Sequence, residues 1–273
     1  MISVDTMTTW NVLGCSVRGS SHERTGKVNE DAYSVGAIGD AGAYAVLSDG
    51  HGSRACFRSA EGASWAVKCT EDVLKARWAQ ELLLSQEGQV KVAQEILSQW
   101  RTQVVRHLKL NPFTRPELDG LDGDQRMQLG RNALLAYGAT LLMCCVLDRE
   151  AVFIQLGDGD FLAMDSTGSV SGIFQQDHRH LGNATTSLCL PNALSEFQYY
   201  RWKGPLPRVF LGSTDGYGNS FRSESDFHRT VRDYARMIDE NGRSAVEKQM
   251  AGWLYETSRY GSGDDITVAL IYR

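Results

Sequence analysis

Acidic residues that lie next to glycine, where apolar runs begin or end, are the feature that most constrains this chain. Three such acids stand out: Asp49 after the run 43–47, Asp215 after the run 209–211, and Asp264 before the run 266–272. Each cluster alone is typical of a surface turn, because Asp and Gly are ordinary turn residues. If the three runs are neighbouring strands, however, the carboxylates converge at one end of a sheet and raise one another's pKa. That convergence predicts one or two divalent cations between them.

The residue types around these acids indicate which cation they would hold. Carboxylate oxygens without cysteine or paired histidine favour Mg²⁺ or Mn²⁺ over Zn²⁺. Glycine after Asp49 lets the backbone approach closely, so the carbonyl oxygen of Gly50 could join the ligands. We therefore expect an oxygen-ligated magnesium or manganese site.

Apolar periodicity predicts a sheet-built core with helices packed outside it. Strands are expected at 10–17, 32–37, 43–47, 139–147, 151–156, 161–164, 197–202, 209–211 and 266–272, and helices at about 54–78, 89–108, 224–239 and 244–258. The strands alternate too little with helices for a doubly wound parallel sheet, so the expected fold class is α+β. The Gly/Ser-rich segment 19–22 is typical of a turn, and the Pro/Gly/Asp-rich segment 111–124 of a surface loop.

Composition and charge exclude several classes of protein. The chain has 273 residues, 42% of them apolar, and a net charge of −5, which excludes collagen-like, coiled-coil and disordered chains and argues against a nucleic-acid partner. Its longest apolar runs, of about seven residues, are far shorter than the roughly 20 that span a bilayer, so no membrane association is expected. The first residues have no apolar core of a signal peptide, and the six cysteines form no CxxC pair. We expect a cytoplasmic protein with reduced thiols.

The order of the motifs along the chain resembles the metal-dependent protein phosphatases of type 2C. Six motifs follow the family order: N-E-D at 29–31, S-D-G-H-G at 48–52, Y-G-A-T at 137–140, L-G-D-G-D at 156–160, S-T-D-G at 213–216 and G-D-D-I-T-V at 263–268. Each motif alone is weak, but the match runs from about Gly14 to Tyr272, nearly the whole chain. The opening GSSHERTGKVNEDAY is similar to a bacterial branch of this family.

The resemblance implies a fold and a domain organisation. Family members are four-layer α-β-β-α sandwiches, in which two mainly antiparallel sheets are flanked by helix pairs. Residues 1–273 would then form a single phosphatase domain with a variable flap at about 166–195. A single domain also follows from the motif order, because Glu30 and Asp264 must meet at one site although they lie near opposite ends of the chain.

The resemblance also implies two metal ions, Mg²⁺ or Mn²⁺, and their ligands. The set consists of one bridging acid and its neighbours: Asp49 on both ions, the Gly50 carbonyl on one, Asp215 and Asp264 on the other, and Glu30 holding a metal water with Asp31 beside it. Two divalent ions would neutralise most of the charge of these acids and bring the metal-bound protein close to zero net charge.

The activity that follows from the resemblance is that of an Mg/Mn-dependent serine/threonine phosphoprotein phosphatase. A metal-activated water would attack phosphorus without a phosphoenzyme, with Asp49 and Asp215 catalytic through the ions they hold. His51 matches the position proposed as general acid for the leaving oxygen, a role that suits the nearly neutral pKa of imidazole. The alternative for His51 is an ordinary turn residue at the start of a helix.

Two departures from the family pattern concern the substrate and a third ion. Gly26 stands where many members carry an arginine that grips the phosphate. His22, Arg24 or Lys27 would have to replace it, and each can also be interpreted as solvated surface; lysine moreover lacks the fork of arginine. No acid stands just before Gly138, where many bacterial members have an aspartate, so the ground for expecting a third ion is missing.

Two further departures concern acids. The family motif Gly-Asp-Ser-Arg reads Gly157–Asp160 here, with an acid in place of the arginine, and we interpret Asp158 as a turn or hydrogen-bonding residue rather than a ligand. The last motif carries Asp265 where the family has asparagine. This extra carboxylate would either tighten the metal or cap a turn.

Two other functions stay open at this point. The missing arginine and the missing third-metal acid suggest a catalytically weak or inactive phosphatase-like module with a binding or regulatory role, against which the intact Asp49, Asp215 and Asp264 argue. A phosphatase of small molecules is the other. For the leading function the implied partner is a phosphorylated protein, with a cognate Ser/Thr kinase by analogy of fold, and a monomer is expected.

Overall fold

The computed structural model describes residues 9–39, 41–147, 149–174 and 186–273. Within them the strands form two five-stranded sheets in which the pairings are antiparallel. One sheet has the order β1 (Asn11–Val17), β10 (Ile266–Tyr272), β9 (Val209–Ser213), β6 (Asp160–Met164), β7 (Val170–Gly172). The other has the order β2 (Ala32–Ile38), β3 (Gly42–Ser48), β4 (Leu141–Leu147), β5 (Glu150–Leu156), β8 (Gln198–Trp202).

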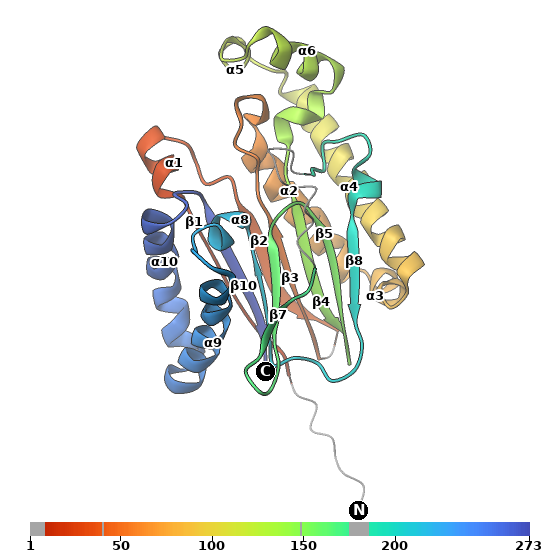
Figure 1. Cartoon of the computed structure of the whole chain (residues 1–273). Coiled ribbons are helices and arrows are strands. Elements are labelled where there is room, and N and C mark those ends of the chain that lie inside the picture. Colours follow the sequence, from red (N-terminus) through yellow and green to blue (C-terminus); the bar gives the residue numbers. More distant parts are fainter. Residues whose placement is uncertain (1–8, 40, 148, 175–185) are drawn as a thin grey trace, which may run out of the picture.

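Helices cover the outer face of each sheet (Figure 1). The β2–β8 sheet is covered by α2 (Ser59–Lys75), α3 (Arg77–Leu83) and α4 (Gln86–Leu110), and the β1–β7 sheet by α9 (Glu224–Asn241) and α10 (Arg243–Tyr260). A separate apolar layer lies between the sheets and includes Ala45, Phe153 and Phe210. These layers confirm the expected α-β-β-α sandwich.

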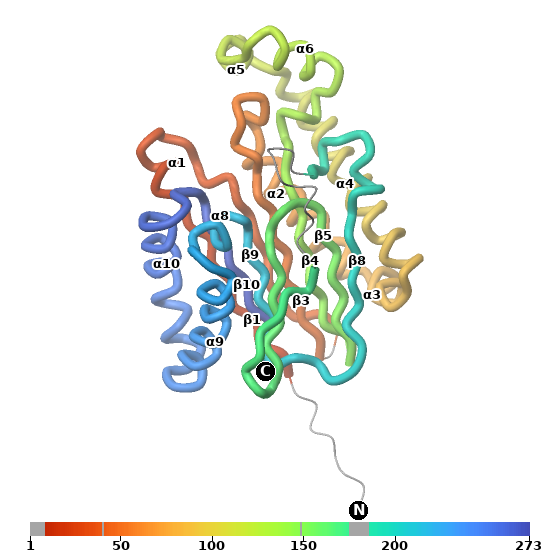
Figure 2. The backbone as a smooth tube through the Cα atoms, viewed as in Figure 1, coloured from red at the N-terminus to blue at the C-terminus, as the bar shows by residue number. Residues whose placement is uncertain are grey.

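The two ends of the chain meet in one sheet. Strand β1 pairs with β10 along its full length, from Asn11 opposite Tyr272 to Val17 opposite Ile266, and the tube view shows the two lying side by side (Figure 2). Because of this pairing, the segments after β1 and before β10 emerge at the same end of the sandwich. The backbone N–H of Glu30 donates to the Asp265 carboxylate at 2.6 Å, so residues 235 apart in sequence are in direct contact.

Several short elements differ from the sequence expectation. The segment 19–22 belongs to a short helix, α1 (Ser20–Thr25), instead of a turn. The segment 111–124, expected to be a loop, contains α5 (Arg115–Asp119) and the start of α6 (Gly123–Arg131). Both of these helices begin with a capping box, Thr114 with Glu117 and Asp122 with Gln125, which satisfies the first free N–H groups locally.

The remaining short helices lie at the ends of strands and longer helices. They are the 3₁₀ helices η1 (Arg54–Cys56) and η2 (Ala133–Tyr137), and the short helices α7 (Ala193–Glu196) and α8 (Asp215–Gly218). Of the expected flap at 166–195, residues 175–185 lie outside the described part of the chain. The six cysteines are unpaired, as expected, and no helix in the described ranges has the length and apolarity that a membrane crossing requires.

A buried arginine, Arg58, attaches the segment that contains α5 and α6 to the sandwich. The Arg58 guanidinium pairs with both carboxylate oxygens of Glu117 at 2.7 and 3.0 Å and donates to the Tyr137 hydroxyl at 2.6 Å. Its backbone N–H donates to the carbonyl of Ala136 at 2.7 Å. The helix η2 ends beside Gly138, and the carbonyl of Gly138 accepts from the His51 N–H at 3.1 Å. The contacts of Arg58 with η2 therefore also support the loop after β3, in which His51 lies.

Two helix glycines offer a matched test of this packing. A Cβ on Gly62 of α2 would lie 2.0 Å from the backbone oxygen of Tyr137, whereas a Cβ on Gly252 of α10 would meet nothing within 4 Å. Gly62→Ala should lower the free energy of unfolding by roughly 2–3 kcal/mol, because a backbone atom must shift. Gly252→Ala should raise it by up to about 1 kcal/mol through helix propensity. Urea unfolding measures both, and equal effects of the two substitutions would contradict the packing described.

Candidate metal centre

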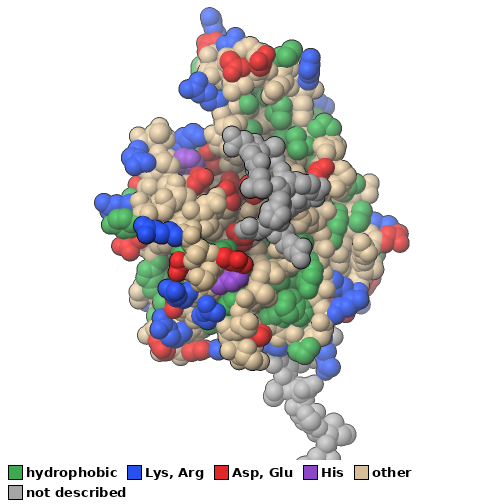
Figure 3. Space-filling model, in the orientation of Figure 1, with side chains coloured by type: hydrophobic (Ala, Val, Ile, Leu, Met, Phe, Trp, Pro, Cys, Tyr) green, Lys and Arg blue, Asp and Glu red, His purple; other side chains and the backbone are tan. Residues whose placement is uncertain are grey.

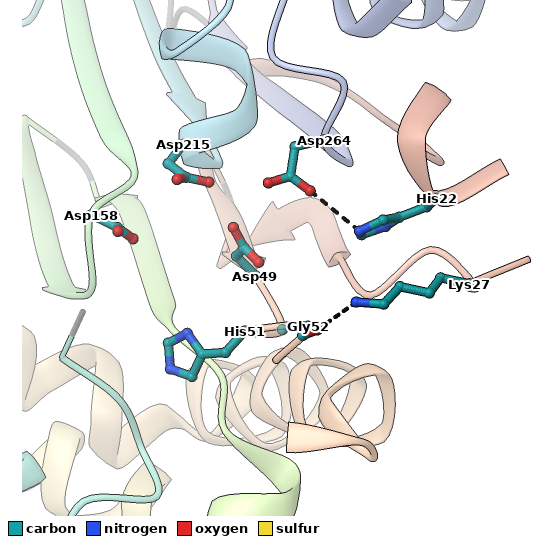
Figure 4. A pocket seen from close by; sticks show the side chains of 9 residues that line it. His22, Lys27, Asp49, His51, Gly52, Asp158, Asp215 and Asp264 are labelled. Atoms are coloured by element: carbon teal, nitrogen blue, oxygen red, sulfur yellow. Dashed lines mark hydrogen bonds and ion pairs between the residues drawn. The ribbon is translucent and has the colours of Figure 1, made fainter. Parts of the chain in front are cut away.

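A pocket of about 190 Å³ lies at the end of the sandwich where the predicted acids emerge (Figure 4). In the space-filling view, acidic side chains gather near the middle of this face, on the side of α1 (Figure 3). The pocket lining consists of His22, Lys27, Asp49, Gly50, His51, Gly52, Asp158, Asp215 and Asp264. The three acids that the strand ends predicted to converge are therefore in one pocket.

Sheet topology explains how these three acids meet. Asp49 directly follows β3 of one sheet, while Asp215 begins α8 just after β9 of the other. Asp264 precedes β10, which pairs with β9 so that Val268 lies opposite Ser213. The close-up view shows the three carboxylates pointing toward a common space (Figure 4). Each acid thus comes from a rigid strand end rather than from a long loop.

Burial and mutual repulsion raise the pKa of the central acids. For Asp49 and Asp215, removal from water is the largest cause, and neighbouring carboxylates add to it. Burial likewise raises the pKa of Asp31, although hydroxyl groups of Thr267 and Thr214 donate to its Oδ2 and oppose the shift. Carboxylates in such surroundings resist ionisation unless a cation offsets their charge. The residues present therefore fit a centre of hard divalent cations.

Glu30 and Asp31 lie beside the pocket rather than in its lining. The Ser59 hydroxyl donates to Oε1 of Glu30 at 2.6 Å, whereas Oε2 is buried with no hydrogen-bond partner among the described residues. Oδ1 of Asp31 is also buried without such a partner. The carbonyl oxygen of Glu30 accepts from the N–H of Gly50 at 3.2 Å, which ties the 29–31 segment to the loop after β3.

The glycines of the loop after β3 are required by close approach. A Cβ on Gly50 would lie 2.8 Å from the carbonyl oxygen of Glu30 and 2.9 Å from Ser59. Gly52 has φ = 56°, a left-handed conformation that favours glycine, and a Cβ there would lie 2.6 Å from Oε2 of Glu30. The sequence Asp-Gly-His-Gly is thus what brings the backbone of this loop against the acid.

His51 lies in the pocket lining on the side opposite Lys27 (Figure 4). Burial lowers its pKa, and the charge of Asp158 partly opposes this effect. Its Nε2 is buried with no hydrogen-bond partner in the described part of the chain. The ring is therefore positioned by its backbone and by contact with Gly138, where a Cβ would lie 2.7 Å from the ring.

Of the three basic candidates, the structure places two in the pocket. Lys27 donates to the carbonyl of Gly52 and lies 3.6 Å from Oε2 of Glu30. His22 lies between two acids, with Nδ1 3.0 Å from Asp265 Oδ1 and Nε2 3.7 Å from Asp264 Oδ1. Arg24 is exposed and does not line the pocket.

Asp158, which the sequence indicated as a turn residue, lines the pocket. Its neighbour Asp160 starts β6, and burial together with the charges of Asp215 and Asp158 raises its pKa to about 7. The run Gly-Asp-Gly-Asp was the available signal, since Asp160 adds a second acid where the family motif has arginine. The structure places Asp158 in the pocket lining, and its interpretation as a residue that binds no ion stays a prediction.

Comparison with known proteins identifies the family. A family model described as "Protein phosphatase 2C" matches residues 18–255, and no curated protein sequence matches this chain. Among solved structures, serine/threonine phosphatase Stp1 from Staphylococcus aureus has a TM-score of 0.63 at 14% identity, covering 97% of this chain and 96% of that one. PppA from Pseudomonas aeruginosa has a TM-score of 0.62 at 17% identity, with 97% and 98% covered.

A third solved structure holds metal. The catalytic domain of serine threonine protein phosphatase PstP, in complex with two manganese ions, has a TM-score of 0.60 at 15% identity and covers 96% of this chain and 97% of that one. At these identities the likeness establishes a common fold.

The raised pKa of Asp160 predicts how the metal-free protein responds to pH. Its folded value of about 7 lies above the ordinary value of 3.8, so the folded state binds a proton more tightly than the unfolded state does. Stability is therefore lost as pH rises from about 4 to 7. Asp160→Asn should raise the free energy of unfolding at pH 8 by up to about 4 kcal/mol, and by less at pH 5. Urea unfolding in chelator at both pH values measures this, and an equal gain at the two would contradict it.

Proposed function

This chain belongs to the protein phosphatase 2C family, and we propose that it is an Mg²⁺- or Mn²⁺-dependent phosphatase of phosphoserine and phosphothreonine in proteins. The observation that carries the proposal is the meeting of Asp49, Asp215 and Asp264 in one pocket, where burial and like charge call for cations. PstP, which shares the fold, holds two manganese ions, and this supports a two-ion centre here.

The proposed ligands are those that the pocket brings together. Asp49 would touch both ions, with the Gly50 carbonyl on one, and with Asp215 and Asp264 on the other. Glu30 and Asp31 would act from beside the pocket, since each has a buried carboxylate oxygen without a hydrogen-bond partner among the described residues. When bound, two such ions would lower the pKa of a bound water and offset the charge of the phosphoryl oxygens.

His51 would donate a proton to the leaving seryl or threonyl oxygen. Its ring lines the same pocket, and the lowered pKa makes its protonated form release that proton readily. Asp158 lines the same pocket, and its charge partly opposes the lowering of the His51 pKa by burial, which favours the protonated form that would donate.

Lys27 is the residue we assign to the substrate phosphate. Its ammonium reaches the pocket and is half exposed, so it can approach an anion. Both ring nitrogens of His22 already face carboxylates, which leaves that side chain poorly suited to bind another anion. Arg24 is exposed and absent from the pocket lining, and it is assigned no role in binding phosphate.

The residues at the site argue for an active phosphatase of proteins and against a catalytically inactive module. Asp49, Asp215 and Asp264 line the pocket, with Glu30 and Asp31 beside it. The acids that would hold metal are therefore present and argue against the inactive alternative. The pocket has a volume of about 190 Å³, and we propose that it takes the phosphoryl group while the rest of the substrate lies outside. We propose a phosphorylated protein, with a cognate Ser/Thr kinase as the source of the phosphate, in the cytoplasm.

Metal dependence is the first test of this function. Hydrolysis of an aryl phosphate should require Mn²⁺ or Mg²⁺ and stop in chelator. Asp215→Asn should lower kcat by at least about 100-fold, because it removes a charge that holds the ions. Asp233→Asn, a change at an exposed aspartate of α9, should leave kcat unchanged. Turnover that persists without metal would refute the mechanism, and preference for phosphotyrosine over phosphothreonine peptides would refute the substrate class.

The phosphate role of Lys27 has a matched control on the same segment. Lys27→Ala should raise KM for a phosphothreonine peptide by about tenfold or more, since a charge-assisted hydrogen bond contributes roughly 1.5–3 kcal/mol. Arg24→Ala removes an equal charge three residues away, outside the pocket, and should leave KM unchanged. Steady-state kinetics at saturating Mn²⁺ separate the two. If both substitutions raise KM equally, the effect is one of general charge and the assignment fails.

A further inference from the structure

We propose that His22, Glu30 and Asp265 form a separate divalent-cation site that takes a first-row transition ion such as Zn²⁺ or Mn²⁺. Each residue offers one ligand atom, and these atoms lie within 4.8 Å of one another. The site goes beyond the proposed phosphatase function, because neither His22 nor Asp265 belongs to the proposed two-ion centre. Glu30 is the one residue that the two centres share.

The three ligands come from segments that the fold holds rigidly together. His22 lies on α1, Glu30 precedes β2 and Asp265 precedes β10. Asp265 is fixed by two backbone donors at 2.6 Å, the N–H of Gly19 on Oδ1 and the N–H of Glu30 on Oδ2. Each carboxylate oxygen has a second lone pair, so the bonds that fix Asp265 leave it able to bind an ion.

Two buried polar atoms at this place have no hydrogen-bond partner among the described residues, which points to an ion as their partner. Glu30 is 8% exposed and Asp265 4% exposed. Glu30 Oε2 and His22 Nδ1 are both buried atoms with no hydrogen-bond partner in the described ranges. Although His22 Nδ1 lies 3.0 Å from Asp265 Oδ1, the two are not joined by a hydrogen bond. Unpaired buried polar atoms cost free energy, and an ion between them would recover it.

The chemistry of the donors selects the ion. One imidazole nitrogen with two carboxylate oxygens favours zinc or manganese over magnesium, which prefers oxygen ligands and retains its water. The competing arrangement has no ion, with His22 paired directly with Asp265 and with Asp264, whose Oδ1 lies 3.7 Å from Nε2. The Lys27 ammonium, 3.6 Å from Glu30 Oε2, opposes a cation but is too distant to hydrogen-bond that oxygen.

Calorimetric titration of the full chain distinguishes the two arrangements. The Asp49→Asn/Asp215→Asn double variant weakens the two-ion centre and leaves the three proposed ligands intact. Titrated with ZnCl₂ and separately with MnCl₂ after chelator treatment, it should bind one equivalent of at least one of the two ions. Adding His22→Ala should weaken that binding by at least about tenfold. Asp265→Asn, similar in size but uncharged, should also weaken it.

His228→Ala is the matched control. His228 is 17% exposed against 15% for His22, and its Nε2 also faces a carboxylate, that of Glu224 at 3.5 Å. It should leave the binding unchanged, and circular dichroism verifies that each variant is folded. No binding of either ion at 1 mM, or unchanged binding in the His22→Ala variant, would overturn the proposal. The phosphatase activity of the wild-type chain is measured separately from this titration. Failure of the proposed function and failure of the proposed cation site can therefore be distinguished.

Discussion

Repulsion among buried carboxylates at one end of the sandwich is the constraint on which the rest of the site depends. Asp49 comes from one sheet and Asp215 from the other, so the packing of the two sheets forces their charges together. Water screens them only weakly, because both are partly buried. A fold that keeps such acids must supply a counter-charge, and divalent ions supply the most charge in the smallest space. The loop glycines and the raised pKa values of the acids fit the centre of divalent ions proposed here.

The sequence predicted the strands and the convergence of acids because both depend on local pattern. The apolar run 266–272 matches β10 residue for residue, and Asp49, Asp215 and Asp264 lie where the ends of such runs required. Short helices were harder to predict from the sequence, because their stability depends on few residues. The capping boxes at Thr114 and Asp122 were present in the sequence, yet the Pro, Gly and Asp between them outweighed that signal.

Residues whose role depends on distant neighbours could not be predicted from the sequence. The sequence left open whether Asp265 tightens the metal or caps a turn. The structure shows its carboxylate accepting two backbone N–H groups, from residues 246 and 235 positions away. Asp158 was interpreted as a turn residue for the same reason, since only the pairing of β6 with β9 brings its segment to the pocket. Nor could sequence alone rank His22, Arg24 and Lys27, which lie within six residues, whereas in the structure His22 and Lys27 line the pocket and Arg24 does not.

In the function proposed here, Lys27 would take the place of the arginine that grips the phosphate in many relatives. His22 faces two carboxylates, whereas Lys27 lines the pocket and its ammonium is half exposed. Lysine is a compact point charge that attracts phosphate without orienting it, because it lacks the planar fork of a guanidinium. In this proposal, orientation of the phosphoryl group would come from the ions that the carboxylates would hold. Such a site would depend more heavily on its metal for substrate geometry than one that grips phosphate through two parallel hydrogen bonds.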